Sequence, residues 1–234
     1  MLNPELIKDA EEVVKDIKEL QAAGLICLDG QFFPTVHYPP ITMYPNITEE
    51  KLFEGYHSSA DNLFVIYAHI PFCIKYCAFC HYPVKIGDLP AEKDHYLDML
   101  EKEMGIYMNR LGLKRIKARS ILVGGGTPTF LAPAQLQRFL NFFTSKIDRT
   151  SCPQFSYDVD PLTLLGPEGK ERLKIMRSYG VDRLTIGAQS LDDGILKKMN
   201  RHHNAEDVLR AVEESKQAGF KINIEFIYGY PGQY

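Results

Sequence analysis

Residues 63–80 read LFVIYAHIPFCIKYCAFC, a short apolar run followed at once by three closely spaced cysteines. The run at 63–68 carries no charge and has the length of a buried strand. Similar runs recur along the chain, and stretches with a helical period separate them. The expected strands are 63–68, 120–123, 155–159, 183–186 and 222–227, and the expected helices are 91–110, 133–146, 168–179 and 205–218. Strands that alternate with helices of this length predict βαβ units around a parallel sheet, an α/β fold.

The first sixty residues follow a different pattern. Apolar residues recur at a helical period over 5–24, and Gly24 stands where a helix stop is expected. Residues 30–60 carry several prolines, which remove backbone donors and predict an irregular arm. We therefore expect an N-terminal helix and irregular arm over residues 1–60 and the α/β domain over residues 61–234. No sixth unit follows the fifth strand, so we expect the domain to be truncated there and to belong to a longer protein.

Composition excludes several classes of protein. The chain has 234 residues, of which 45% are hydrophobic and 24% charged, a globular balance that excludes disorder and low complexity. A formal charge of −3 gives no basic footprint for nucleic acid. No window approaches the ~18 apolar residues of a membrane span, and the start is not a secretory signal. Five cysteines do not form a disulfide framework, so a cytoplasmic setting is expected.

The three clustered cysteines carry the chemistry. Cys73, Cys77 and Cys80 form a C-x3-C-x2-C motif, which predicts three thiolates on one loop around one metal centre. A closed zinc site needs a fourth ligand, and the adjacent His81 is poorly placed to supply it. Three protein ligands leave one iron of a 4Fe–4S cluster open, as a cluster that activates a substrate requires. The spacing favours the cluster, and zinc remains the alternative.

Further motifs make a family resemblance plain. The cysteine loop after a first βα strand is similar to that of radical S-adenosylmethionine (SAM) enzymes. Six stretches in the same order resemble the oxygen-independent coproporphyrinogen III oxidase family. They are residues 67–73, 124–129, 158–161, 183–190, 200–202 and 227–233. The resemblance implies a partial (β/α)6 barrel of the TIM type with the cluster over its C-terminal face. It also implies a 4Fe–4S cluster and one or two SAM molecules as cofactors.

The resemblance also implies which residues bind these cofactors. Cys73, Cys77 and Cys80 would hold the cluster, and the other implied residues would contact SAM or the cluster. They are Tyr67, Phe79, Gly124, Gly125, Gly126, Thr127, Asp158, Gln189, Arg201 and Glu225. Each also has an ordinary structural explanation, such as a tight turn for the glycines or a core aromatic for Tyr67. Family members usually carry glutamate at position 158 and aspartate at position 225, so both acids here differ in length. Catalytic residues beyond these are not assigned.

One departure from the family pattern bears on the activity. The resemblance implies a longer motif, C-x3-C-x2-C-x-C, in coproporphyrinogen oxidases. This chain has Tyr82 at the position of the last cysteine. Relatives that lack this cysteine include haem-handling chaperone-like proteins and C-methyltransferases that bind two SAM molecules. The resemblance therefore implies a radical SAM oxidoreductase or transferase that cleaves SAM to a 5′-deoxyadenosyl radical. Its expected reaction is oxidative decarboxylation of a coproporphyrinogen III-type substrate, or radical C-methylation.

Two other interpretations remain open. In one, the protein binds or delivers haem and holds a cluster without turnover. In the other, zinc stabilises an interaction domain. For the enzyme we expect a small organic substrate, porphyrin-related in the leading hypothesis, and an electron donor of the flavodoxin or ferredoxin type. Neither nucleic acid nor a membrane span is expected.

Overall fold

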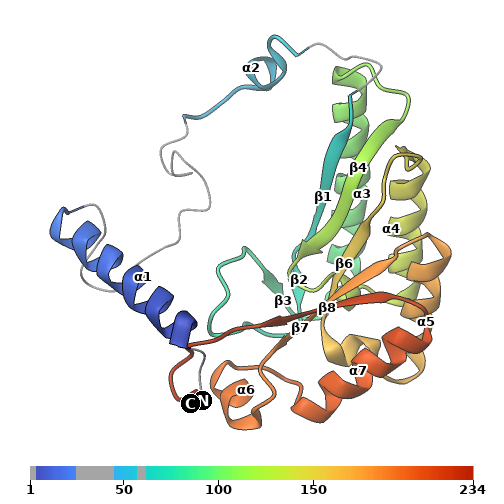
Figure 1. Cartoon of the computed structure of the whole chain (residues 1–234). Coiled ribbons are helices and arrows are strands. Elements are labelled where there is room, and N and C mark those ends of the chain that lie inside the picture. Colours follow the sequence, from blue (N-terminus) through green and yellow to red (C-terminus); the bar gives the residue numbers. More distant parts are fainter. Residues whose placement is uncertain (1–3, 25–44, 57–61, 234) are drawn as a thin grey trace. The chain divides into compact units, whose positions relative to one another are not determined.

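The structure is a computed structural model that describes residues 4–24, 45–56 and 62–233 (Figure 1). The chain divides into two compact units, Met1–Glu54 and Gly55–Tyr234. The domain boundary expected between residues 60 and 61 stays a prediction.

The first unit contains two helices. Helix α1 (Pro4–Ala22) confirms the helix predicted over 5–24, and α2 (Glu49–Phe53) interrupts the arm that was expected to be irregular. The Thr48 hydroxyl caps α2 by accepting from the Lys51 backbone N–H at 3.4 Å, a polar start signal that is easily overlooked in a proline-bearing stretch. Residues 25–44 of the arm lie outside the described residues.

The second unit is built on a parallel sheet. Its main strands are β1 (Phe64–Ile70), β4 (Ile116–Gly125), β6 (Phe155–Val159), β7 (Arg183–Gln189) and β8 (Lys221–Phe226). They lie in the order β1-β4-β6-β7-β8, and every neighbouring pair is parallel. The five predicted strands are confirmed. Three two-residue strands escaped prediction: β5 (Ile147–Asp148) beside β4, and β2 (Phe72–Cys73) paired with β3 (Lys85–Ile86).

Four long helices connect these strands and cover one face of the sheet (Figure 1). They are α3 (Pro90–Arg110), α4 (Pro133–Ser145), α5 (Gly166–Ser178) and α7 (Ala205–Gln217), and they confirm the helices predicted there. A six-residue helix, α6 (Asp193–Lys198), was not predicted. Single 3-10 turns, η2 (Pro128–Phe130) and η3 (Pro161–Leu164), follow β4 and β6.

The core lies between the sheet and the helices. Side chains alternate along β4: Ile121 and Val123 are buried beneath the helices, while Leu122 points to the other face and is 38% exposed. Phe139 and Phe143 of α4 stack with ring centroids 5.1 Å apart and fill this layer. Each such side chain stabilises the fold by roughly 1.5–3 kcal/mol.

On the face away from the helices, the described residues of the second unit leave side chains exposed. On β1, Val65 is 71% exposed and Tyr67 is 51% exposed. Within the described residues the sheet runs from β1 to β8 without closing, which agrees with a partial barrel of the TIM type. Because all main strands are parallel, their C-terminal ends meet at one edge, where barrel enzymes carry their active sites.

Candidate cofactor site

The three cysteines lie on the segment 71–85, called here the cysteine loop, which follows β1 directly. The first of them, Cys73, lies in β2. Lys85 N–H donates to Pro71 O at 2.8 Å, which brings the end of the loop back beside its start. The Tyr76 hydroxyl donates to Cys80 O at 2.6 Å across the loop. These bonds hold Cys73 and Cys80 on one compact turn although the segment has almost no regular structure.

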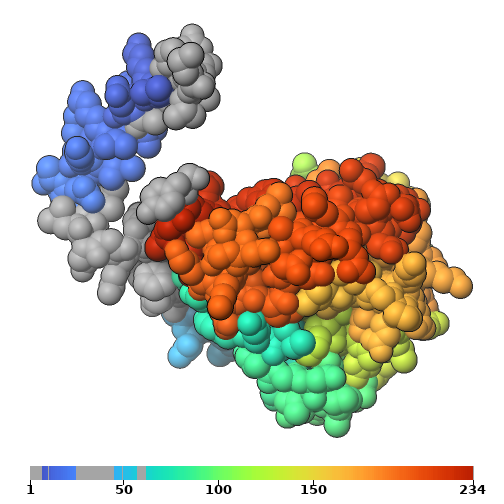
Figure 2. All heavy atoms as spheres, turned by 90° about the horizontal axis from the view of Figure 1, so that it is seen from below, coloured from blue at the N-terminus to red at the C-terminus, as the bar shows by residue number. Residues whose placement is uncertain are grey.

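The loop is also tied to the segment after α6. Ala78 N–H donates to Met199 O at 3.0 Å, and the Asn200 side-chain amide donates to Tyr76 O at 2.6 Å. From below, the teal residues of the loop lie beside the orange residues around α6 (Figure 2). Hydrogen bonds to a segment more than a hundred residues away in the sequence therefore hold the loop in place.

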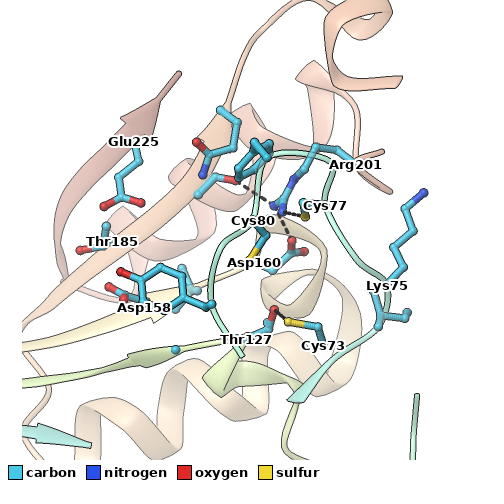
Figure 3. Close-up of a pocket in the computed structure, with 18 of the residues that line it drawn as sticks. Cys73, Lys75, Cys77, Cys80, Thr127, Asp158, Asp160, Thr185, Arg201 and Glu225 are labelled. Carbon is cyan, nitrogen blue, oxygen red and sulfur yellow. Dashed lines mark hydrogen bonds and ion pairs between the residues drawn. The ribbon is translucent and has the colours of Figure 1, made fainter. Parts of the chain in front are cut away.

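A cavity of about 470 Å³ opens at the C-terminal edge of the sheet (Figure 3). It brings together every predicted site residue except Gly124: Tyr67, Cys73, Cys77, Phe79, Cys80, Gly125, Gly126, Thr127, Asp158, Gln189, Arg201 and Glu225. Further lining residues that were not among the predicted site residues include Lys75, Asp160, Thr185 and His202. Residues from five strands, from the cysteine loop and from the segment after α6 thus face one space.

The glycine segment, Gly124, Gly125 and Gly126 at the end of β4, lets the strands and the cysteine loop approach one another. A Cβ on Gly124 would lie 2.5 Å from Asp158 Oδ2, and one on Gly126 would lie 2.9 Å from Cys73 Sγ. Gly125 has a φ of 116°, which side chains rarely adopt. The segment is therefore required for packing against the cysteine loop. Gly124 is buried and is not among the residues that line the cavity.

Thr127 joins the glycine segment to the first cysteine. Gly126 N–H donates to Ile70 O, and Thr127 N–H donates to Phe72 O, both at 2.8 Å. The Thr127 hydroxyl forms a hydrogen bond of 3.5 Å with Cys73 Sγ. Burial raises the pKa of this thiol, while the bond to Thr127 lowers it.

Arg201 occupies the centre of the polar contacts. Its Nη1 donates to Cys77 Sγ at 3.0 Å, and its Nη2 donates to Asp160 Oδ2 at 2.7 Å and to Gly187 O at 3.0 Å (Figure 3). The side chain is only 10% exposed. The sequence singled out this arginine, but nothing in it predicted a contact with a cysteine.

Asp160 is a site residue that sequence reasoning missed. It is 4% exposed, and its Oδ1 accepts from Leu162 N–H at 3.0 Å and from His202 Nε2 at 3.1 Å. Burial alone would raise the pKa of Asp160, but the bonds from its histidine neighbours and the charge of Arg201 hold it well below its usual range. The available signal was an acid directly before Pro161, the position of an N-cap.

Asp158 stands in a different environment on the same strand. Burial, with the negative charge of Glu225 added, raises the pKa of Asp158 to about 7, against a hydrogen bond with Thr185 that lowers it. In Figure 3 Asp158, Thr185 and Glu225 lie on the side of the cavity away from Cys73. The cavity therefore has a cysteine and arginine side and an acidic side.

Two other expectations concern Tyr67 and Gln189, and two further cysteines, Cys27 and Cys152, lie outside the C-x3-C-x2-C motif. The Tyr67 hydroxyl forms a hydrogen bond of 2.9 Å with His69 Nδ1, so both side chains have a local structural role. Gln189 has a φ of 69° where the pairing of β7 and β8 shifts, a strained geometry that turns its side chain toward the cavity. Cys152 lies away from the cavity and donates its thiol to Gln154 O at 3.2 Å. Cys27 lies outside the described residues.

Comparison with known proteins gives the family. The model of the radical SAM superfamily matches residues 67–234. This chain belongs to the radical SAM superfamily. Within the part of the chain that the structure describes, no helix is long and apolar enough to cross a membrane.

Relatives of this radical SAM chain include haem chaperones and coproporphyrinogen III oxidases. The haem chaperone HemW of Bacillus subtilis is 34% identical over 71% of this chain and 43% of its own length. The oxygen-independent coproporphyrinogen III oxidase of Helicobacter pylori is 32% identical over 83% of this chain and 44% of its own. The solved structure of the coproporphyrinogen III oxidase HemN from Escherichia coli, a radical SAM enzyme, has a TM-score of 0.73 and 27% identity, covering 84% of this chain and 44% of that one. The chain thus spans less than half the length of these relatives.

The superfamily implies a 4Fe–4S cluster and SAM in general terms, and the residues present fit both. Three thiols on one short loop face one cavity, the donor set typical of such a cluster. Among residues 4–24, 45–56 and 62–233, no three His, Cys, Asp or Glu side chains gather round a single metal-ion position. The cavity also offers carboxylates, an amide and a guanidinium, which suit a ligand carrying hydroxyl, amino and carboxylate groups.

Proposed function

We propose that this chain binds a 4Fe–4S cluster through Cys73, Cys77 and Cys80, binds SAM in the adjoining cavity, and cleaves it reductively to act on an organic substrate. One observation carries the proposal. The three thiols share a single cavity with Gly125 and Gly126, with the acids Asp158 and Glu225, and with Arg201. The cavity lies at the edge of the sheet where such barrels carry active sites.

The chain's own residues would divide the work as follows. Cys73, Cys77 and Cys80 would hold the cluster, which would supply one electron for reductive cleavage of SAM to methionine and a 5′-deoxyadenosyl radical able to abstract hydrogen from the substrate. The backbone after β4 approaches the methionine end of SAM, and Gln189 and Arg201 bind its polar groups. Asp158 and Glu225 accept from ribose hydroxyls. Tyr67 and Phe79 exclude water beside the cluster and the adenine.

The test is anaerobic reconstitution with iron and sulfide, followed by dithionite and SAM. We expect 5′-deoxyadenosine in stoichiometric or greater yield. The Cys80→Ala chain should form none, while Cys152→Ala, which removes a thiol outside the cavity, should behave as the unaltered chain. A reconstituted chain that holds iron but releases no 5′-deoxyadenosine, with or without candidate substrates, contradicts the enzymatic proposal.

A porphyrin-related substrate is the leading proposal for what the radical acts on. Val65, Tyr67 and Leu122 leave exposed apolar surface on the open face of the sheet next to the cavity, which suits a flat apolar ring. The reaction would be oxidative decarboxylation of a coproporphyrinogen III-type substrate or radical C-methylation. A flavodoxin- or ferredoxin-type donor and a cytoplasmic setting stay predictions.

A second candidate is haem binding or delivery without turnover. Two observations favour it. This chain has Tyr82 at the position where the resemblance places a fourth cysteine in coproporphyrinogen oxidases. Several similar proteins are named haem chaperones. Titration with haem under anaerobic conditions distinguishes the two. Tight binding of one haem per chain, with no 5′-deoxyadenosine from SAM, supports the chaperone; SAM cleavage without haem binding supports the enzyme.

A further inference from the structure

A buried charge pair lies directly beside one of the three cysteines. The Asp160 carboxylate and the Arg201 guanidinium are 4% and 10% exposed, and they meet at 2.7 Å. The same guanidinium donates to Cys77 Sγ at 3.0 Å through its other terminal nitrogen. One arginine thus connects a carboxylate to a thiol that the proposed function assigns to the cluster.

The carboxylate is fixed on several sides. Asp160 accepts from Leu162 N–H at the start of η3 and from His202 Nε2, the residue that follows Arg201. His203 Nδ1 lies 3.8 Å from the other carboxylate oxygen, and its Nε2 bonds with Ala188 O at 3.1 Å. These donors fix the position of the Asp160 carboxylate independently of Arg201. Asp160 can therefore orient the Arg201 guanidinium.

The arginine is held just as firmly. Gly187 O accepts from Arg201 Nη2 at 3.0 Å, so a strand carbonyl and a carboxylate share one end of the guanidinium fork. The Arg201 Nε is buried and has no hydrogen-bond partner among the described residues. With one end of the planar fork fixed, the other end is directed toward Cys77.

We propose that Asp160 is a positioning residue that holds the Arg201 guanidinium against Cys77 and offsets its charge, so that this pair sets the reduction potential of the cluster bound there. The inference rests on the proposed cluster. It assigns to Asp160 and Arg201 a role that is separate from binding SAM.

The sign of each contribution follows from electrostatics. A reduced cluster carries one more negative charge, and a hydrogen bond or a positive charge beside a ligand sulfur stabilises that state. Arg201 therefore raises the potential. Asp160 lowers it by partly neutralising the arginine, and both effects are strong because the pair is removed from water.

The test is a redox titration of the reconstituted chain, followed by electron paramagnetic resonance in the absence of SAM. Asp160→Asn keeps an acceptor but leaves the arginine charge uncompensated, so we expect the potential to rise. Arg201→Gln removes the positive charge, so the potential should fall. Each shift should be a tenfold change in the ratio of reduced to oxidised cluster at fixed potential, which for one electron is about 59 mV.

Two further variants guard against a loss of stability alone. The double variant Asp160→Asn/Arg201→Gln leaves no unpaired buried charge, so it should fold and lie between the two single variants. Glu168→Gln removes the carboxylate partner of another buried arginine, Arg172, at 2.9 Å on α5, and should leave the potential unchanged.

The outcomes separate the two proposals. Opposite shifts in the single variants, with Glu168→Gln unchanged, support the inference. Shifts in the same direction overturn it and leave the cluster in place. So do single variants whose ratio of reduced to oxidised cluster at fixed potential stays within twofold of the unaltered chain, or a cluster-loaded double variant whose potential lies outside the range set by the two single variants. An unaltered chain that takes up no iron overturns the proposed function, and this inference with it.

Discussion

Asp158 and Asp160 lie two residues apart at the end of β6, and their carboxylates meet opposite environments. Asp160 is paired with Arg201 and hydrogen bonded by His202, which keeps it charged. Asp158 faces Glu225, and its pKa is raised to about 7. Because side chains alternate along a strand, residues two apart point to the same side. The difference therefore arises from what each carboxylate meets across the cavity.

The first prediction concerns pH and Asp158. Its pKa is higher in the folded chain, about 7 against the usual 3.8, so the folded chain keeps a proton that the unfolded chain loses between these values. The free energy of unfolding therefore falls as pH rises through that window. Asp158→Asn removes this decrease in the free energy of unfolding with pH. The stabilisation of the variant relative to the unaltered chain should therefore be about 1–3 kcal/mol larger at pH 8 than at pH 5.

Urea denaturation at the two pH values, without SAM, measures this difference. Glu225→Gln should act in the same direction but more weakly, since the charge of Glu225 is the smaller of the two causes. Equal stabilisation by Asp158→Asn at pH 5 and pH 8 would show that the carboxylate has an ordinary pKa.

The second prediction concerns the ligands. Cys73→Ala, Cys77→Ala and Cys80→Ala should each abolish the cluster, because the loop offers no spare thiol. The loss should exceed the ~10–100-fold in affinity that follows removal of a residue supporting a metal ligand. Iron content and the visible spectrum after anaerobic purification measure it. Cys152→Ala should keep both, and retained iron in any of the three variants would reject the assigned ligand set.

How far the sequence predicts this fold depends on the length of each element. Five apolar runs and the helices between them are long enough for their period to be recognised, and all are confirmed. The pairs β2–β3 and β4–β5 involve strands of two residues, which carry no period. Helix α6 has six residues, and its one local signal is Asp192, whose side chain accepts from Ile195 N–H.

The candidate site was predictable to the extent that single motifs carry it. Motif positions placed twelve residues that the structure does bring to one cavity. Contacts between motifs were not predictable, because they depend on how distant strand ends meet. The bond from Arg201 to Cys77 spans 124 positions, and the packing of Gly126 on Cys73 becomes visible only when β1 and β4 lie side by side.

The third prediction uses that packing. A Cβ on Gly126 would meet Pro71 O at 2.8 Å and Cys73 Sγ at 2.9 Å, and the backbone has no positive φ that would strain another residue. Gly126→Ala should therefore push the cysteine loop away from β4 and destabilise the chain by about 1–3 kcal/mol. Thermal unfolding and iron uptake measure the two effects.

Gly105→Ala is the matched control for this change. Gly105 lies within α3, and a Cβ there would have nothing within 4 Å. The same substitution should stabilise the helix by up to about 1 kcal/mol and leave iron uptake unchanged. If Gly126→Ala were as harmless as Gly105→Ala, the close packing of the glycine segment on the loop would be refuted.

The last prediction concerns Asn200, which ties the loop to α6. Its φ is 59°, and its side chain donates to Tyr76 O at 2.6 Å. Asn200→Gly keeps the backbone geometry but loses the bond, whereas Asn200→Ala loses both and should cost roughly 1 kcal/mol more. In both variants, amide hydrogen exchange over residues 74–80 should become faster, because opening of the loop then breaks one fewer hydrogen bond.

Asn204→Ala provides the comparison that isolates the loop. Asn204 caps α7 by accepting from Asp207 N–H at 2.9 Å, so its loss should cost about 1 kcal/mol of stability as well. Because that cap does not contact the loop, exchange over residues 74–80 should stay unchanged. Equal acceleration in Asn204→Ala and Asn200→Gly would mean that the loop opens only with the whole domain, and that Asn200 does not specifically hold it.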